Sequence, residues 1–209
     1  MNRVELKEKA KASLNGKYGD AILMMIVYFL MEIVLTFILG FTGGLLSLSE
    51  NAVSLLSSIF SIIFSGLFGF GMISYYLKVS RNEEVTYKEL FSKFDLCLPY
   101  ILISLTTGAF IFLWSLLFII PGIIASISYT LVYMIKLDNP EMSTMEVISK
   151  SKEMMKGHKI DYVVLVLSFL GWSILGIFTL GILYLWLIPY MSVTFANFYN
   201  SLKAKETTI

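Results

Sequence analysis

The chain alternates between long apolar runs and shorter polar stretches. The apolar runs cover residues 21–41, 53–77, 96–135 and 162–199. A helix needs about 20 apolar residues to cross roughly 30 Å of hydrocarbon, so the first two runs suit one crossing each and the last two suit two each. The pattern predicts an all-α, polytopic helical membrane protein. Its six transmembrane helices are expected as three hairpins, each preceded by a short cytoplasmic amphipathic helix.

The distribution of basic residues predicts which ends of the spans face the cytoplasm. All sixteen lie in the N-terminal stretch, in the polar stretches 78–95 and 136–161, and in the tail. The segments around 47–51, 121–122 and 179–181 contain none. Positively charged loops stay inside, so both termini are expected in the cytoplasm. An even number of crossings between successive basic stretches follows, and three hairpins satisfy it.

We expect one membrane domain over residues 1–209. The span after Pro121 is the short one, because residues 122–135 reach only about 21 Å as a helix. It either thins the bilayer, begins before the proline, or re-enters without crossing. The expected divisions are a cytoplasmic amphipathic helix at 1–19, hairpins at 21–78, 96–136 and 161–200, a cytoplasmic loop at 79–95, a second amphipathic helix at 137–160 and a tail at 201–209.

Each hairpin begins directly after an aspartate, namely Asp20, Asp95 or Asp161. A carboxylate there can accept from the unpaired N–H groups of a helix start and suits the positive end of the helix dipole. The first and third aspartates also share a Gly-x-x-x-Asp lead, from Gly16 and Gly157. The pattern indicates either an internal duplication or three independent hairpins that need similar caps.

The polar stretches between hairpins carry signals of short helices. Thr86–Glu89 and Ser143–Glu146 have the spacing of capping boxes, and Gly157 suits the end of a helix. Between residues 143 and 156 the spacing predicts an amphipathic helix on the cytoplasmic surface, with its apolar arc against lipid or the bundle. That arc consists of Val147, Ile148, Ser151, Met154 and Met155.

Glu32 is the ionisable side chain that lies well inside an apolar run. Because a charge at the bilayer centre costs roughly 2.5–3.5 kcal/mol, such residues usually face the bundle interior. Thr107 and Ser173 stand at the same distance after their aspartates as Glu32 after Asp20, so we expect a polar layer of the three at similar depth. Glu32 is then either a proton or cation relay or substrate counter-ion, or a protonated carboxyl hydrogen-bonded to a neighbouring helix.

The second apolar run contains a stripe of small residues at spacings of three and four, and Gly40 and Gly44 make a shorter one. Small residues let helices approach closely in membranes. We interpret the stripe as a surface for helix packing, and a polar pore lining is the functional alternative. The stripe consists of Ser54, Ser58, Ser61, Ser65 and Gly69.

Composition narrows the function. Hydrophobic residues make up 57% of the chain and charged residues 15%, too few to cover a soluble globule. A net charge of +1 argues against nucleic acid as a partner. The single cysteine excludes an internal disulfide and any cysteine metal cluster, and no catalytic or cofactor motif occurs, so we expect no metal, no cofactor and no enzyme. Lys156, His158 and Lys159 are candidate contacts for lipid phosphate.

The second half of the chain resembles the bacterial domain-of-unknown-function 975 membrane family, most specifically over residues 113–199. That resemblance implies a multi-pass protein of the bacterial plasma membrane and supplies no catalytic residues. We interpret the chain as a non-enzymatic accessory, assembly or interaction factor, with the lipid bilayer and a membrane protein or second copy as partners. A small transporter using Glu32 is the alternative, and a lipid-acting or self-protection protein is a third. The resemblance rests on Pro121-Gly122, Tyr129, Asn139-Pro140, Met155-Lys156-Gly157-His158, Asp161, Leu167-Ser168-Phe169, Gly171-Trp172 and Pro189-Tyr190.

Overall fold

A computed structural model describes residues 2–206, and within that range the chain forms helices and turns without a β-strand. Its helices are α1 (Arg3–Leu14), α2 (Tyr18–Leu45), α3 (Glu50–Ser80), α4 (Cys97–Leu117), α5 (Ile119–Ser128), α6 (Val132–Asp138), α7 (Thr144–Met154), α8 (Lys159–Leu167), α9 (Leu170–Phe178) and α10 (Tyr184–Glu206). Two short 3₁₀ turns, η1 (Tyr87–Phe91) and η2 (Phe94–Leu96), stand where a surface helix was expected before the second hairpin.

Five segments are long and apolar enough to span a membrane, in agreement with a membrane location. They cover residues 18–45, 50–80, 94–117, 119–138 and 159–178. The fourth begins before Pro121, which lies in the first turn of α5, where its missing N–H costs no helical hydrogen bond. The sixth expected span, α10, carries Asn197 and Asn200 and is not among the five. A count of six spans therefore stays a prediction.

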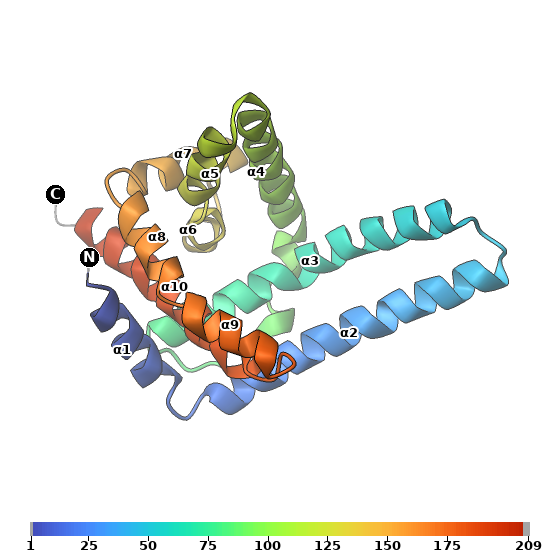
Figure 1. Ribbon diagram of the computed structural model, residues 1–209, viewed down its shortest axis with the longest axis horizontal. Coiled ribbons are helices and arrows are strands. Elements are labelled where there is room, and N and C mark those ends of the chain that lie inside the picture. Colours follow the sequence, from blue (N-terminus) through green and yellow to red (C-terminus); the bar gives the residue numbers. More distant parts are fainter. Residues whose placement is uncertain (1, 207–209) are drawn as a thin grey trace.

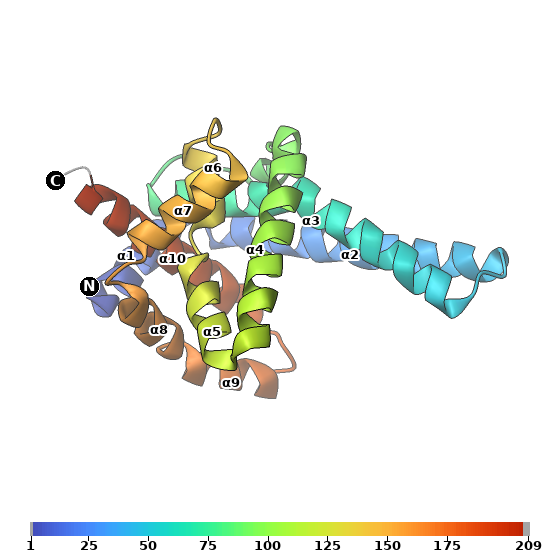
Figure 2. The ribbon, with the colours of Figure 1, turned by 90° about the horizontal axis from the view of Figure 1, so that it is seen from above.

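The helices are arranged around α10, with α1 beside it, and the hairpins extend in different directions (Figures 1 and 2). The α2–α3 hairpin projects far from the rest of the molecule, while α4 runs steeply across α3. The crossing point has glycines, since a Cβ at Gly69 would lie 2.5 Å from the Tyr100 ring of α4 and one at Gly66 would lie 2.8 Å from Ile101. The hairpins are thus not stacked as one parallel bundle.

The stripe of small residues on α3 is used for packing only at its end nearest α4. Gly69 contacts α4 closely, whereas Ser54, Ser58 and Ser61 are exposed. A Cβ at Gly40 or at Gly44 of α2 would meet nothing within 4 Å. These small residues leave an open surface on the projecting hairpin.

The core lies where the hairpin bases meet α1, α7 and α10. Tyr75, Phe169 and Tyr199 are among its largest fully buried side chains. α7 lies against this core through the predicted apolar arc, all of whose residues are buried, so the prediction of an amphipathic helix is confirmed and its arc faces the bundle. The buried arc residues are Val147, Ile148, Ser151, Met154 and Met155.

α1 packs against the body of the protein with Leu6, Ala10 and Leu14 buried on one face. Its Lys7 reaches the turn between α8 and α9, where Nζ donates to the Ser168 carbonyl at 2.9 Å and lies 3.9 Å from the centroid of the Phe169 ring. Because this lysine is partly buried and surrounded by other cations, its pKa is lowered. α1 is therefore part of the packed body of the protein.

Candidate functional site

The three residues of the predicted polar layer do not meet. Glu32 is half-buried on α2 and lies in a hollow of about 470 Å³ whose other lining residues, from Phe29 to Phe37, also belong to α2. Thr107 is buried on α4, where its hydroxyl donates to the Ile103 carbonyl of its own helix at 2.6 Å. Ser173 on α9 likewise donates to the Phe169 carbonyl at 3.1 Å.

Equal distance along three spans gives equal depth only when the spans run parallel and side by side. Because the hairpins diverge (Figure 1), the depth-matching argument fails. Within the part of the chain that the structure describes, the Glu32 carboxylate has no hydrogen-bond partner. Apart from the backbone bonds of α2, the bond at this residue runs from the Thr36 hydroxyl to the Glu32 backbone carbonyl. The prediction that Glu32 points into the bundle toward a partner on another helix of this chain is wrong.

The three aspartates stand at helix starts, but none is an N-cap. Asp20 and Asp161 both occupy the first turn, two residues after the first residue of α2 and α8. Asp95 lies in η2, and α4 begins two residues later without a side-chain cap. The carboxylates of Asp20 and Asp161 therefore suit the helix dipole from the first turn, and the N-cap positions are held by Lys17 and His158. The shared register after Gly16 and Gly157, both with positive φ, agrees with the repeated lead.

One predicted capping box forms and the other does not. Ser143 and Glu146 bond reciprocally at the start of α7. Thr86 makes no side-chain cap, and the backbone N–H of Glu89 donates to the Thr86 carbonyl instead. The Glu89 carboxylate, the other half of the predicted box, accepts from Ser74 at 2.7 Å and from Lys78 at 3.0 Å. Burial alone would raise the pKa of Glu89, but these hydrogen bonds hold it below its usual value. The carboxylate fixes η1 against α3.

The predicted lipid contacts occupy the turn between α7 and α8. Lys156 is exposed, and Lys159, half-buried, begins α8. His158 is occupied within the chain, since its Nδ1 lies 3.0 Å from the Asp161 carboxylate. Neither lysine has a carboxylate within salt-bridge distance among residues 2–206. Both remain candidates for an external anion.

A buried polar cluster that the sequence did not predict joins α3, α6 and α10. The Asp138 carboxylate, 8% exposed, accepts two parallel bonds from Arg81 at 2.9 and 2.7 Å. It also accepts from the Tyr199 hydroxyl at 2.9 Å and from Lys203 at 2.5 Å. Burial would lower the pKa of Arg81, but Asp138 raises it. We call these four residues the Asp138 cluster.

The Asp138 cluster holds helices together, and its geometry does not suit acid–base chemistry. Its carboxylate is saturated with donors, so it has no remaining capacity to act as a base. The cluster joins the ends of α3 and α6 to α10, three helices that are distant in sequence. Sequence offers little signal for it, because Arg81, Asp138 and Tyr199 are separated by more than fifty residues each and look like ordinary loop and tail charges.

These features define the class as a helical protein with membrane-compatible spans, a packed body and a projecting apolar hairpin. In residues 2–206 no group of three His, Cys, Asp or Glu side chains is placed to hold a metal ion. The model of the family described as "Protein of unknown function (DUF975)" matches residues 1–125 and 116–206, and the chain belongs to that family. No curated protein and no solved structure matched the chain.

Proposed function

We propose that this chain is a non-enzymatic, multi-pass protein of the bacterial plasma membrane, with both termini in the cytoplasm, that acts as an accessory, assembly or interaction factor. The α2–α3 hairpin is its partner-binding element. The partner is another membrane protein or a second copy of the chain, which contributes a helix to the face around Glu32.

The observation that supports this proposal is the unpartnered carboxyl on an unpacked helix. Between residues 26 and 63 Gly43 is the one buried position, and it faces Val53 of the same hairpin. Large apolar side chains such as Phe29, Ile33 and Phe37 stay 45–71% exposed beside Glu32. Lipid suits these apolar groups but leaves the carboxyl without a hydrogen bond, at a cost of roughly 2.5–3.5 kcal/mol if it is charged. A polar group on a partner helix removes that cost.

Transport through Glu32, the alternative, lacks a specific observation in its favour. A conducting path needs walls from several helices, and the hollow at Glu32 is lined by α2 alone. Any such path has to be completed by another chain at the same face. Both functions therefore require association through the hairpin, and the first experiment is the same.

The experiment places a photo-crosslinking phenylalanine analogue at Phe29, which lines the Glu32 hollow. The same analogue at Ile38, about 180° from Phe29 around the helix and also half-exposed, is the matched control. After irradiation of intact membranes we expect a protein adduct from position 29 and mainly lipid adducts from position 38. Lipid adducts alone at both positions would overturn the proposal.

Two substitutions then separate the two functions. Glu32→Leu should reduce the protein adduct because it removes the polar bond, while Glu32→Gln should preserve it because the amide still forms hydrogen bonds. Retention of the adduct in Glu32→Gln, together with loss of a pH- or cation-dependent flux into vesicles, would transfer support to the transporter.

A further inference from the structure

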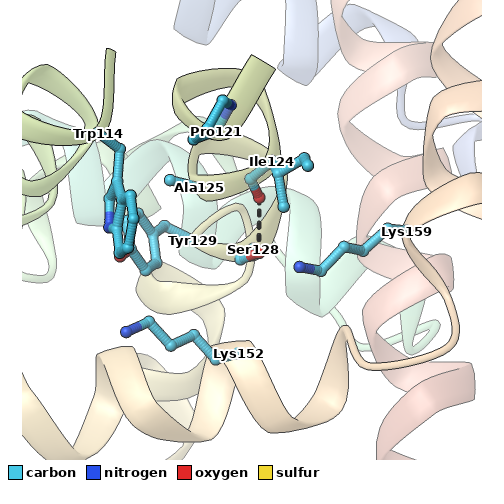
Figure 3. A pocket seen from close by; sticks show the side chains of 8 residues that line it. All are labelled: Trp114, Pro121, Ile124, Ala125, Ser128, Tyr129, Lys152 and Lys159. Atoms are coloured by element: carbon cyan, nitrogen blue, oxygen red, sulfur yellow. Dashed lines mark hydrogen bonds between the residues drawn. The ribbon is translucent and has the colours of Figure 1, made fainter. Parts of the chain in front are cut away.

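A hollow of about 310 Å³ lies between α4, α5, α7 and α8, on a different part of the molecule from the hairpin (Figure 3). Its walls are the rings of Trp114 and Tyr129 with Pro121, Ile124 and Ala125. A second hollow of about 340 Å³ runs along α4 and shares Trp114, Tyr129 and Lys152 with the first. We call the pair of hollows the Trp114 groove.

Two ammonium groups enter this apolar groove from different helices. Lys152 comes from α7 and lies 5.4 Å from the centroid of the Tyr129 ring, and Lys159 comes from the start of α8 and points toward Ser128 (Figure 3). Cations beside aromatic and aliphatic side chains lose part of their hydration, so their attraction to an anionic partner is stronger than in water.

The backbone at both lysines is held in place by neighbouring contacts. Ser151, directly before Lys152, is fully buried and donates to the Ser128 carbonyl of α5 at 2.7 Å. Lys159 follows the left-handed turn at Gly157. The α4–α5 wall is equally constrained, because a Cβ at Gly122 would lie 2.0 Å from the Ser115 hydroxyl. The groove is therefore built by the fold and not by the rotamers of its two cations.

The charge of the groove is uncompensated within residues 2–206. Neither Lys152 nor Lys159 has a carboxylate within salt-bridge distance there. Other lysines of the same region do have partners: Lys150 lies 2.8 Å from the Glu206 carboxylate, and the buried Lys136 donates to two backbone carbonyls. The two groove lysines thus differ from Lys136 and Lys150 in lacking an internal acceptor.

We propose that the Trp114 groove binds an anionic phospholipid. Its phosphate lies between Lys152 and Lys159, and its two acyl chains follow the two hollows past Trp114. Two cations attract a negative headgroup over a zwitterionic one, and the apolar walls require hydrocarbon, which a free phosphate does not supply. This lipid site is independent of the proposed partner face on α2.

Trp114 provides a direct probe of occupancy. In a Trp172→Phe/Trp186→Phe background it is the remaining tryptophan, and both replaced side chains are about half-exposed. The protein is placed in phosphatidylcholine nanodiscs containing a minor fraction of lipid brominated on its acyl chains, either phosphatidylglycerol or phosphatidylcholine. Brominated phosphatidylglycerol should quench Trp114 more strongly at equal mole fraction, and the difference should shrink as salt is added.

Charge-matched variants decide between a site and a general surface effect. Lys152→Gln/Lys159→Gln should abolish the preference for phosphatidylglycerol, whereas Lys88→Gln/Lys205→Gln, which removes the same charge from two exposed lysines outside the groove, should retain it. Equal quenching by the two lipids, or equal loss in both variants, would overturn the proposal. So would loss of the preference when inorganic phosphate replaces chloride at constant ionic strength, since that result would identify the ligand as the free anion. Unchanged circular dichroism of the variants confirms that folding is intact.

Discussion

The Asp138 cluster allows a quantitative prediction for Asp138→Asn. The two carboxylate oxygens receive four donor contacts, two from Arg81 and one each from Tyr199 and Lys203. An asparagine of the same shape keeps one acceptor oxygen and turns an NH₂ toward donors. It therefore loses the charge and most of the hydrogen bonds at once, and it leaves the cations of α3 and α10 facing each other.

The magnitude follows from the burial of each partner. Removing one member of a fully buried ion pair costs about 3–5 kcal/mol. Here the carboxylate is 8% exposed, but the side chains of Arg81 and Lys203 are 29% and 47% exposed and regain water. We therefore expect Asp138→Asn to lower the free energy of unfolding by about 2–3 kcal/mol. Lys203→Gln, which removes a side chain that is itself half-exposed, should cost less than about 1 kcal/mol.

The assay is equilibrium unfolding in mixed micelles with a rising fraction of dodecyl sulfate, followed by tryptophan fluorescence. A double variant, Arg81→Met/Asp138→Leu, completes the test, because replacing both members with apolar groups should recover much of the loss. A change of less than about 0.5 kcal/mol for Asp138→Asn, within the range of ordinary surface substitutions, would refute the assignment. The assignment would also be refuted if Arg81→Met/Asp138→Leu lowered the free energy of unfolding by as much as the two single substitutions added together.

Three further predictions test topology, packing and acid stability. In a cysteine-free background, a single cysteine at Asn51 should react with an impermeant reagent from outside, and one at Glu153 only after the cells are opened; the reverse would contradict the six-span topology. Gly71→Ala should destabilise the fold by about 1–3 kcal/mol, because its Cβ would lie 2.3 Å from a carbonyl oxygen of η1, whereas Gly108→Ala, in open space within α4, should be neutral or stabilising in the same unfolding assay. Hydrogen bonds hold the pKa of Glu89 below its usual value of about 4.5, so the Glu89 carboxylate stabilises the fold above that pH and ceases to do so as the pH falls through the lower folded pKa. Glu89→Gln should therefore make the free energy of unfolding depend less on pH below about 4.5. An unchanged pH dependence in that range would contradict this.

Local patterns in the sequence predicted local structure well. The arc from Val147 to Met155 is buried as expected because helical periodicity and a capping box depend on neighbours within a few residues. Gly157 takes a left-handed conformation just after α7 for the same reason. The spans from 18 to 80 follow from apolar length alone. Each of these inferences needed no knowledge of how distant segments pack.

Arrangement in space was less accessible. The layer of Glu32, Thr107 and Ser173 required three parallel adjacent spans, and the structure has diverging hairpins instead. The Asp138 cluster requires residues from three separate helices to meet, which no spacing in the chain encodes. The spacing of residues 143–156 leaves Lys152 outside the apolar arc of its helix, and no local pattern predicts that the Tyr129 ring at the end of α5 lies beside it.

The two proposals lie on separate elements, and this separation makes them distinguishable. Glu32 belongs to the outer half of α2, whereas Lys152 and Lys159 flank a groove made by α4, α5, α7 and α8. Glu32→Leu should therefore leave the quenching of Trp114 by brominated phosphatidylglycerol unchanged, and Lys152→Gln/Lys159→Gln should leave the crosslink from position 29 intact. Were either variant to alter both readings, the partner would have to contact both elements. The hairpin would then cover the groove in an assembly, and the groove would be a protein interface in place of a lipid site.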